Sequence, residues 1–205
     1  VYRAFAKARK RRGALDLDLP EVAISMTDEH TVSDVSPRPR NDAHRLIEEC
    51  MIAANVEAAR FLGKHRIPGL YRVHPQPDED RFEELRVMLQ ELGYKVTAEA
   101  RTQPRALNKI LRQLRERPDF PVLATSVLRT FSQAVYQPDN EGHYGLALAA
   151  YAHFTSPIRR YPDLLVHRAI VHLLEGGKPR AFEHSAADMQ VLGRNCSMLE
   201  RQAEA

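Results

Sequence analysis

The sequence has little cysteine, the residue that forms disulfides and many zinc sites. Its two cysteines, Cys50 and Cys196, lie far apart and have no CxxC or CxxH neighbours. This pattern argues against a zinc site and for a reducing compartment. No apolar run is long enough to span a bilayer, and no charged–apolar–small pattern of a signal peptide opens the chain. We therefore expect a cytoplasmic protein.

Charge of one sign is not in large excess, because 30 basic residues stand against 27 acidic ones and the formal net charge is +3. Hydrophobic residues make up 43% of the chain, which is typical of a soluble protein with a core. Basic residues nevertheless cluster at residues 3–12, at 101–117, and at Arg159-Arg160 with Arg168. Such clusters can neutralise phosphates. For the first two clusters, solvated helix faces explain the pattern equally well.

The two ends carry no stop signals. The chain begins with Val1 rather than Met, and a basic helical pattern follows at once. Residues 197–205 are good helix formers without Gly or Pro. We expect a fragment of a longer protein.

Apolar spacing and helix breakers predict a mostly helical chain. A helix at residues 1–12 should end at Gly13, and a long helix capped by Asn41 or Asp42 should run to about His65. Short strands are expected at 14–18 and 21–26, with an extended segment at 70–74. The other expected helices cover 77–93, 106–114, 122–136, 162–174 and the residues from 184 or 185 onward. The predicted class is α+β, helix-rich in this fragment, beside a sheet whose strands lie largely outside it.

The segment 151–168 (YAHFTSPIRRYPDLLVHR) is the most informative part of the chain. Two prolines five residues apart predict a rigid bend, and the second suits the first turn of a helix. Arg159 and Arg160 stand just before that helix, where the N–H groups and the helix dipole favour anions. Guanidinium groups suit phosphate oxygens. The alternative is a structural pair between an arginine and Asp163, and we expect one arginine in each role.

The histidines do not predict a metal site. His44, His74 and His143 lack the spacing of metal ligands. His167 and Arg168, one turn beyond the bend, are expected to form structural pairs.

The same bend carries a family resemblance. FTSPIRRYPD at residues 154–163, followed by His167-Arg168, resembles the signature of the ribonuclease II/ribonuclease R family. Other segments are similar to further motifs of that family: RNDAHRLIEECM at 40–51, LYRVH at 70–74, and SQAVY at 132–136 with GHYGL at 142–146. The order and spacing suit the ribonuclease R branch better, and the resemblance spans nearly the whole chain.

The resemblance implies a fold, an activity and a cofactor. Residues 1–205 would be part of an RNB-type catalytic domain of a hydrolytic 3′→5′ exoribonuclease, which releases nucleoside 5′-monophosphates from single-stranded RNA. Two Mg²⁺ ions held by an aspartate cluster activate water in this family. That cluster precedes the region present here, and the pair Asp16 and Asp18 is a poor substitute. The family's cold-shock and S1 modules are also absent from this chain.

The resemblance also assigns roles to residues. Arg159 matches the catalytic arginine that contacts the scissile phosphate, and Glu48 matches the acidic residue that recognises the 3′-terminal ribose. Arg160 and Tyr161 belong to the same RNA-binding motif. Glu200 matches a glutamate on the RNA exit side, although an exposed helical glutamate explains it equally well. Leu17 falls where relatives often carry a Phe that stacks on a base, so the apolar contact remains without the π face.

A second class of function stays open. A non-catalytic RNA-binding or scaffold protein can use the same fold after loss of the aspartates. The sequence upstream of Val1 would separate the two, because only the enzyme needs the acidic motif there.

Overall fold

The computed structural model describes residues 1–15, 22–28, 30–37 and 41–204. These residues are mainly helical, which confirms the helix-rich α+β prediction. The described strands are short and form two separate antiparallel pairs, β1–β2 and β3–β4. In chain order the elements are α1 (Tyr2–Arg12), β1 (Val22–Met26), β2 (Val32–Pro37), α2 (Asp42–His65), β3 (Tyr71–Val73), α3 (Glu79–Glu91), α4 (Glu99–Thr102), α5 (Pro104–Leu114), α6 (Phe120–Arg129), β4 (Val135–Gln137), α7 (Tyr161–Leu174), a 3-10 turn (Pro179–Ala181) and α8 (Ala186–Glu204).

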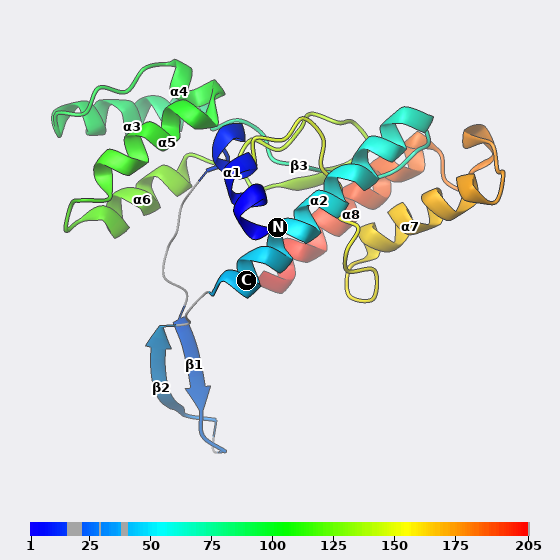
Figure 1. Cartoon of the computed structure of the whole chain (residues 1–205), viewed down its shortest axis with the longest axis horizontal. Helices are drawn as coiled ribbons and strands as arrows, with labels where there is room; N and C mark the ends of the chain where they lie inside the picture. The colour runs from blue at the N-terminus through cyan, green and yellow to red at the C-terminus, as the bar shows by residue number, and fades with distance from the viewer. Residues whose placement is uncertain (16–21, 29, 38–40, 205) are drawn as a thin grey trace.

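The long helix α2 forms where the cap and the apolar spacing predict it. The side chain of Asn41 accepts a hydrogen bond from the His44 backbone N–H at 3.0 Å, which satisfies one free donor of the first turn. The helix then continues to His65 and buries one apolar face, including Ile52, Val56 and Leu62. Helix α2 runs through the middle of the molecule and carries several residues of the candidate site described below (Figure 1).

In Figure 1, two groups of helices lie on either side of α1. Helices α3 to α6 bury one apolar core, in which Leu89, Leu107, Leu114 and Val127 are fully enclosed. On the other side, α2, α7 and α8 enclose the β3–β4 pair. The two prolines and the turn before α7 therefore belong to the second group.

Helix α8 approaches the β3–β4 pair very closely. A Cβ atom on Gly193 would lie 2.5 Å from the Tyr136 carbonyl oxygen, so only glycine fits there. One turn later, the Ser197 hydroxyl accepts a hydrogen bond from the Tyr136 N–H at 2.9 Å and donates one to the Gly193 carbonyl. These contacts bind α8 to β4.

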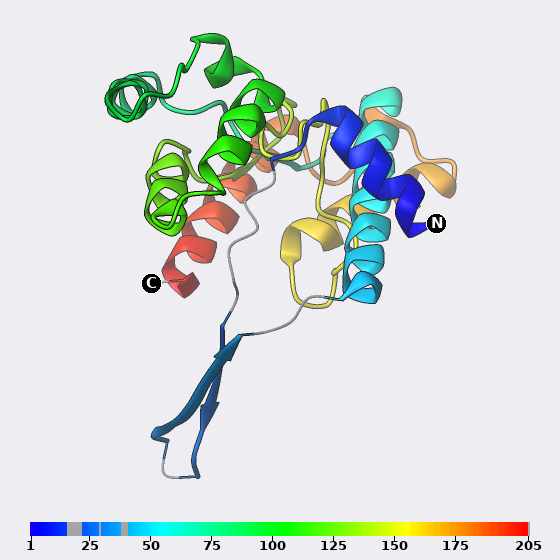
Figure 2. The same cartoon turned by 60° about the vertical axis from the view of Figure 1, so that its left-hand side comes forward.

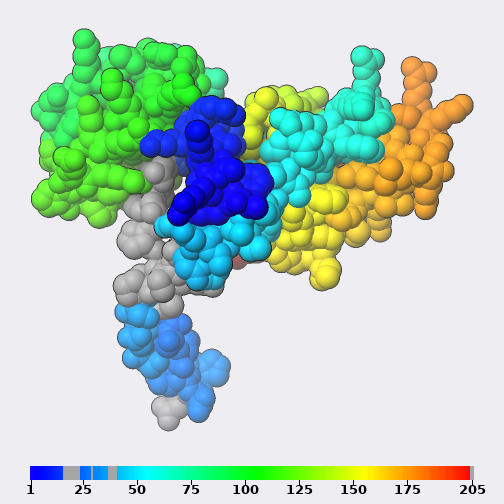
Figure 3. Space-filling model, in the orientation of Figure 1, coloured from blue at the N-terminus to red at the C-terminus, as the bar shows by residue number. Residues whose placement is uncertain are grey.

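The β1–β2 pair extends away from the helices (Figures 1 and 3). Its register places Ile24 opposite Val35, and a bulge follows at Ser25/Met26. Because strand side chains alternate between faces, the register puts the apolar residues on one face. Ile24, Met26, Val32 and Val35 remain 56–60% exposed there.

Several predicted boundaries need correction. The helix predicted at 122–136 is wrong in its second half, because α6 ends at Arg129 and Val135–Gln137 forms β4. The Thr130 hydroxyl donates to the Val127 carbonyl at 2.7 Å at this helix end, and β4 instead pairs with β3. Ala14 and Leu15 are not in a strand, while residues 16–18 lie outside the described residues. Helix α4 and strand β2 were not predicted.

In the part of the chain that the structure describes, no helix is both long and apolar enough to cross a membrane.

Candidate functional site

The segment between Phe154 and Arg160 forms a tight bend that is anchored by one buried carboxylate. Asp163, in the first turn of α7, has no exposed surface. Its Oδ1 accepts hydrogen bonds from the Ser156 N–H and from the Arg160 guanidinium, each at 2.8 Å. Because the carboxylate holds both ends of the bend, the predicted rigid turn before the helix is present.

Asn55 anchors the start of the same bend from α2. Its side chain is buried, and its Oδ1 accepts hydrogen bonds from the N–H groups of Phe154 at 2.9 Å and Thr155 at 3.3 Å. Its Nδ2 donates to the Tyr151 hydroxyl at 2.9 Å. One amide therefore fixes the position of the bend relative to α2.

The two arginines of the bend have different surroundings. Arg160 is only about one fifth exposed and forms an ion pair with Asp163. Arg159 is exposed, and no ion pair or side-chain hydrogen bond joins it to another described residue. The predicted structural arginine is thus Arg160, and the phosphate contact predicted for the other arginine stays a prediction. The next residue, Tyr161, is 44% exposed at the start of α7.

His167 packs under the bend. Its Nε2 lies 2.8 Å from the Phe154 carbonyl oxygen, and its ring stacks on the Phe154 ring with centroids 4.1 Å apart. The predicted structural pairing of His167 is therefore present. Arg168 is exposed and lies 3.9 Å from Glu183, so its pairing is a surface contact.

Glu48 lies on α2, two turns before Asn55. It lines a cavity of about 470 Å³ together with Asn55, Tyr151 and Arg160, so the structure brings these α2 residues and the bend together. Its neighbour Glu49 is buried and forms an ion pair with Arg9 of α1 at 2.9 Å, while Glu48 lies 3.5 Å from the same guanidinium. Arg9 therefore locks α1 against the acidic part of α2.

Glu200 belongs to a separate group. It forms an ion pair with Arg72 of β3, and the Arg72 guanidinium lies 4.5 Å from the centre of the Tyr136 ring. The Tyr136 hydroxyl is 2.8 Å from Nδ1 of His153, whose pKa burial lowers to about 3. Burial also raises the pKa of Tyr136 to about 12. Glu200 does not line the cavity that Glu48 and Arg160 share.

Leu17, Asp16 and Asp18 lie outside the described residues. Among the residues that the structure does describe, no three His, Cys, Asp or Glu side chains form a group that could hold a metal ion. The described donors thus do not fit the Mg²⁺ pair that the family resemblance implies.

The bend carries an exposed arginine and is anchored by Asp163 and Asn55, in the segment that resembles the family signature. Comparison of the whole sequence with known families identifies the family. Residues 1–176 match the RNB domain. The chain belongs to the RNB domain family. It is 42% identical to ribonuclease R of Escherichia coli (strain K12), over all of this chain and 26% of that protein. Identity to ribonuclease R of Aquifex aeolicus is 40%, over 100% of this chain and 29% of that protein.

Two solved structures share the fold of this chain. The apo form of Mycoplasma genitalium RNase R matches with a TM-score of 0.89 at 24% identity, over 98% of this chain and 32% of that one. Yeast Ssd1, described as a pseudonuclease, matches with a TM-score of 0.66 at 23% identity, over 77% of this chain and 20% of that one. The chain thus spans only about a fifth to a third of the length of these proteins.

Sequence reasoning missed Asn55, Arg9 and Arg72 in this RNB domain. A signal existed for Asn55, because it is a polar residue on the apolar face of a helix, and buried polar side chains need partners. Arg9 and Arg72 gave no such signal, since their partners Glu49 and Glu200 lie 40 and 128 positions away.

Proposed function

We propose that this chain is the helix-rich part of the catalytic domain of a 3′→5′ hydrolytic exoribonuclease. Its substrate is single-stranded RNA, its products are nucleoside 5′-monophosphates, and it works in the cytoplasm. Membership of the RNB domain family and 42% identity to ribonuclease R support this proposal. The observation that carries it is the exposed Arg159 on a bend that Asp163 and Asn55 hold rigid.

In this proposal each residue acts on a different part of the RNA. Arg159 binds the scissile phosphate, where its fork-shaped guanidinium matches two oxygens. Glu48 accepts hydrogen bonds from the ribose hydroxyls at the 3′ end, which distinguishes RNA from DNA. Arg160 and Tyr161 support the strand from the same bend. Glu200 lies toward the exit side, and Leu17 makes an apolar contact with a base.

Hydrolysis in this proposal needs Mg²⁺, which supplies an activated water and charge neutralisation when bound. The ligands must come from outside the described residues, because these contain no suitable carboxylate group. Asp16 and Asp18 alone cannot assemble a two-metal site, so the 205-residue chain alone should be inactive. The aspartate-bearing part of the domain and the cold-shock and S1 modules would belong to a longer gene product.

The test uses the full-length product of the gene and an unstructured RNA labelled at its 5′ end. With Mg²⁺, the label should move through progressively shorter RNAs, and 5′-monophosphates should accumulate. A matched RNA with a 3′-terminal phosphate should resist degradation. Internal cleavage fragments, or equal attack on the blocked RNA, would contradict the proposal.

A second candidate is a non-catalytic RNA-binding protein, because yeast Ssd1, described as a pseudonuclease, matches this chain with a TM-score of 0.66. This candidate predicts that the full-length product binds the same RNA with Mg²⁺ present and leaves its length unchanged.

A further inference from the structure

The end of α1 is fixed tightly against α5. Gly13 has a positive φ of 85°, and a Cβ atom there would lie 2.9 Å from the Cβ of Arg105. Asn108 of α5 donates hydrogen bonds to the carbonyl oxygens of Gly13 at 3.0 Å and Ala14 at 2.6 Å. These contacts bring together the two basic clusters whose role the sequence left open.

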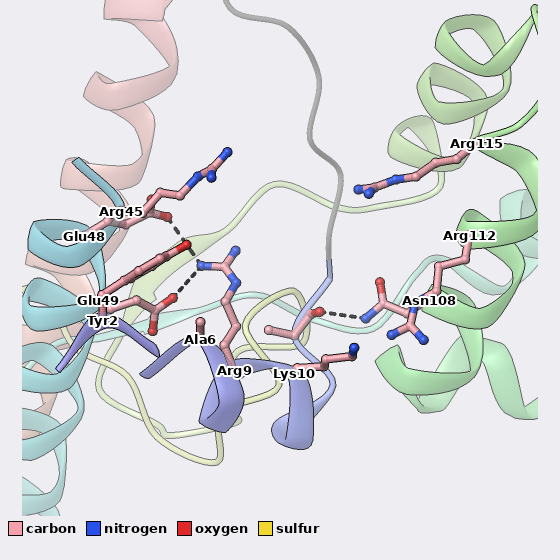
Figure 4. A pocket seen from close by; sticks show the side chains of 11 residues that line it. Tyr2, Ala6, Arg9, Lys10, Arg45, Glu48, Glu49, Asn108, Arg112 and Arg115 are labelled. Carbon is pink, nitrogen blue, oxygen red and sulfur yellow. Dashed lines mark hydrogen bonds and ion pairs between the residues drawn. The ribbon is translucent and has the colours of Figure 1, made fainter. Parts of the chain in front are cut away.

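The junction opens into a cleft of about 460 Å³ between α1, α2 and α5 (Figure 4). Each of the three helices contributes basic side chains to it. Arg112 and Arg115 follow Asn108 along one face of α5, since residues four and seven apart share a helix face. In Figure 4, Arg45 of α2 and Arg115 point toward each other across the opening. Arg9 and Lys10 of α1 complete the basic lining.

These cations are only partly neutralised. Arg9 is held by Glu48 and Glu49, and Arg45 makes an exposed contact of 3.6 Å with Asp42. No ion pair joins Lys10 or Arg112 to a carboxylate of the described residues, and both side chains are exposed. Two cations in a concave site without internal partners favour an anionic ligand.

We propose that this cleft binds backbone phosphates of an RNA strand through Lys10, Arg45 and Arg112. The inference rests on the proposed function for the identity of its ligand. It adds a second contact surface, separate from the bend that carries Arg159. Glu48 lines both the cleft and the cavity beside Arg160, so the two sites are adjacent.

The lining fits RNA better than other polyanions. The cleft also contains the carboxylates of Glu48 and Glu49 and the ring of Tyr2. An acidic peptide or an anionic membrane would meet these carboxylates with like charge. RNA alternates phosphates with sugar hydroxyls, which can donate to a carboxylate, and with bases, which can stack on an aromatic ring.

The test measures binding of a fluorescein-labelled, unstructured single-stranded RNA to the 205-residue chain by anisotropy, without Mg²⁺, over a range of KCl concentrations. The variant K10Q/R45Q/R112Q removes one cation from each helix. The control K64Q/K178Q/R180Q removes the same charge from exposed residues at the C-terminal end of α2 and after α7, far from α5 (Figures 1 and 2).

A phosphate contact on single-stranded nucleic acid changes the slope of log K against log salt by about 0.7. The cleft variant should therefore flatten the slope by about 2 and weaken binding about tenfold or more at low salt. The control should change the slope much less. Thermal unfolding of both variants should match the wild type, because the substituted side chains are at the surface. If the cleft variant unfolds at a lower temperature, the single variant R112Q replaces it and should flatten the slope by about 0.7.

An equal loss of RNA affinity in both triple variants would overturn the proposal that the cleft binds RNA and would indicate RNA binding by general positive charge. Tighter binding to vesicles containing phosphatidylserine than to RNA, with the same loss in the cleft variant, would also overturn the assignment to RNA. Because RNA degradation by the full-length gene product is measured separately, failure of the cleft and failure of the nuclease proposal are distinguishable.

Discussion

Replacing Asn55 with leucine should destabilise the protein and release the bend, because one side chain makes three buried hydrogen bonds. Leucine has a similar size but neither accepts nor donates. The N–H groups of Phe154 and Thr155 and the Tyr151 hydroxyl would lose their partner. A buried polar group left unsatisfied costs about 1–3 kcal/mol. Since Phe154 and Thr155 are half-buried, the lower end applies to each, and the sum is about 2–4 kcal/mol.

For a chain of this size, such a loss lowers the melting temperature by roughly 5–15 °C. Circular dichroism measures this shift, and hydrogen exchange should show faster exchange at Phe154 and Thr155. N195L is the matched control, since Asn195 is exposed on α8. N55D keeps the acceptor and should fall between wild type and N55L. A loss below about 1 kcal/mol, or unchanged exchange at both amides, would refute the anchoring role of Asn55.

Three further predictions follow from contacts described above. First, burial lowers the pKa values of His143 and His153 to about 3, so both are neutral when folded and titrate near 6.5 when unfolded. Stability should be full above pH 6.5 and should fall as the pH decreases below it, by up to about 2.7 kcal/mol per pH unit while both histidines stay neutral in the folded state, as measured by urea titrations; a flat profile would contradict this. Second, G193A should lower the melting temperature, because its methyl group meets the Tyr136 carbonyl at 2.5 Å; the exposed G176A, which meets nothing within 4 Å but has a positive φ, should cost only about 1 kcal/mol. Third, R159A in the full-length gene product should slow single-turnover RNA cleavage by roughly 10²-fold or more with little loss of stability. By contrast R160A should destabilise, since it leaves the buried Asp163 carboxylate without its cation. Equal melting temperatures for R159A and R160A would contradict the structural role of Arg160.

The parts of the fold that could be predicted from sequence depend on local signals. Gly13 ends α1, the Asn41 cap and the apolar spacing set the start and course of α2, and two prolines set the bend before α7. Strand β4 could not be predicted in this way. Residues 122–136 have continuous apolar spacing, and the three-residue strand is stabilised by its partner β3, more than 60 residues earlier, and by Ser197 of α8, about 60 residues later.

The same division holds for the site. The motif predicted one arginine toward a phosphate and one structural arginine. The structure shows the structural pair, because Asp163 lies three residues from Arg160, and the phosphate contact of Arg159 stays a prediction. The contacts that place α2 against the bend depend on Asn55, about 100 residues away from Phe154 in sequence. The roles of Glu48, Tyr161, Glu200 and Leu17 toward RNA stay predictions.

The packing of α8 shows that the folded structure extends beyond the residues that match the RNB domain family. The RNB match ends at residue 176, before α8 begins. Yet Met189 is fully enclosed in a cluster with Leu70 and Leu165, and Glu200 neutralises Arg72 inside the matched region. A chain cut at the family boundary would leave a buried cation without its counter-charge and an apolar surface facing water. Any variant that is shortened for expression should therefore retain the residues through Glu200, even though they lie outside the matched sequence.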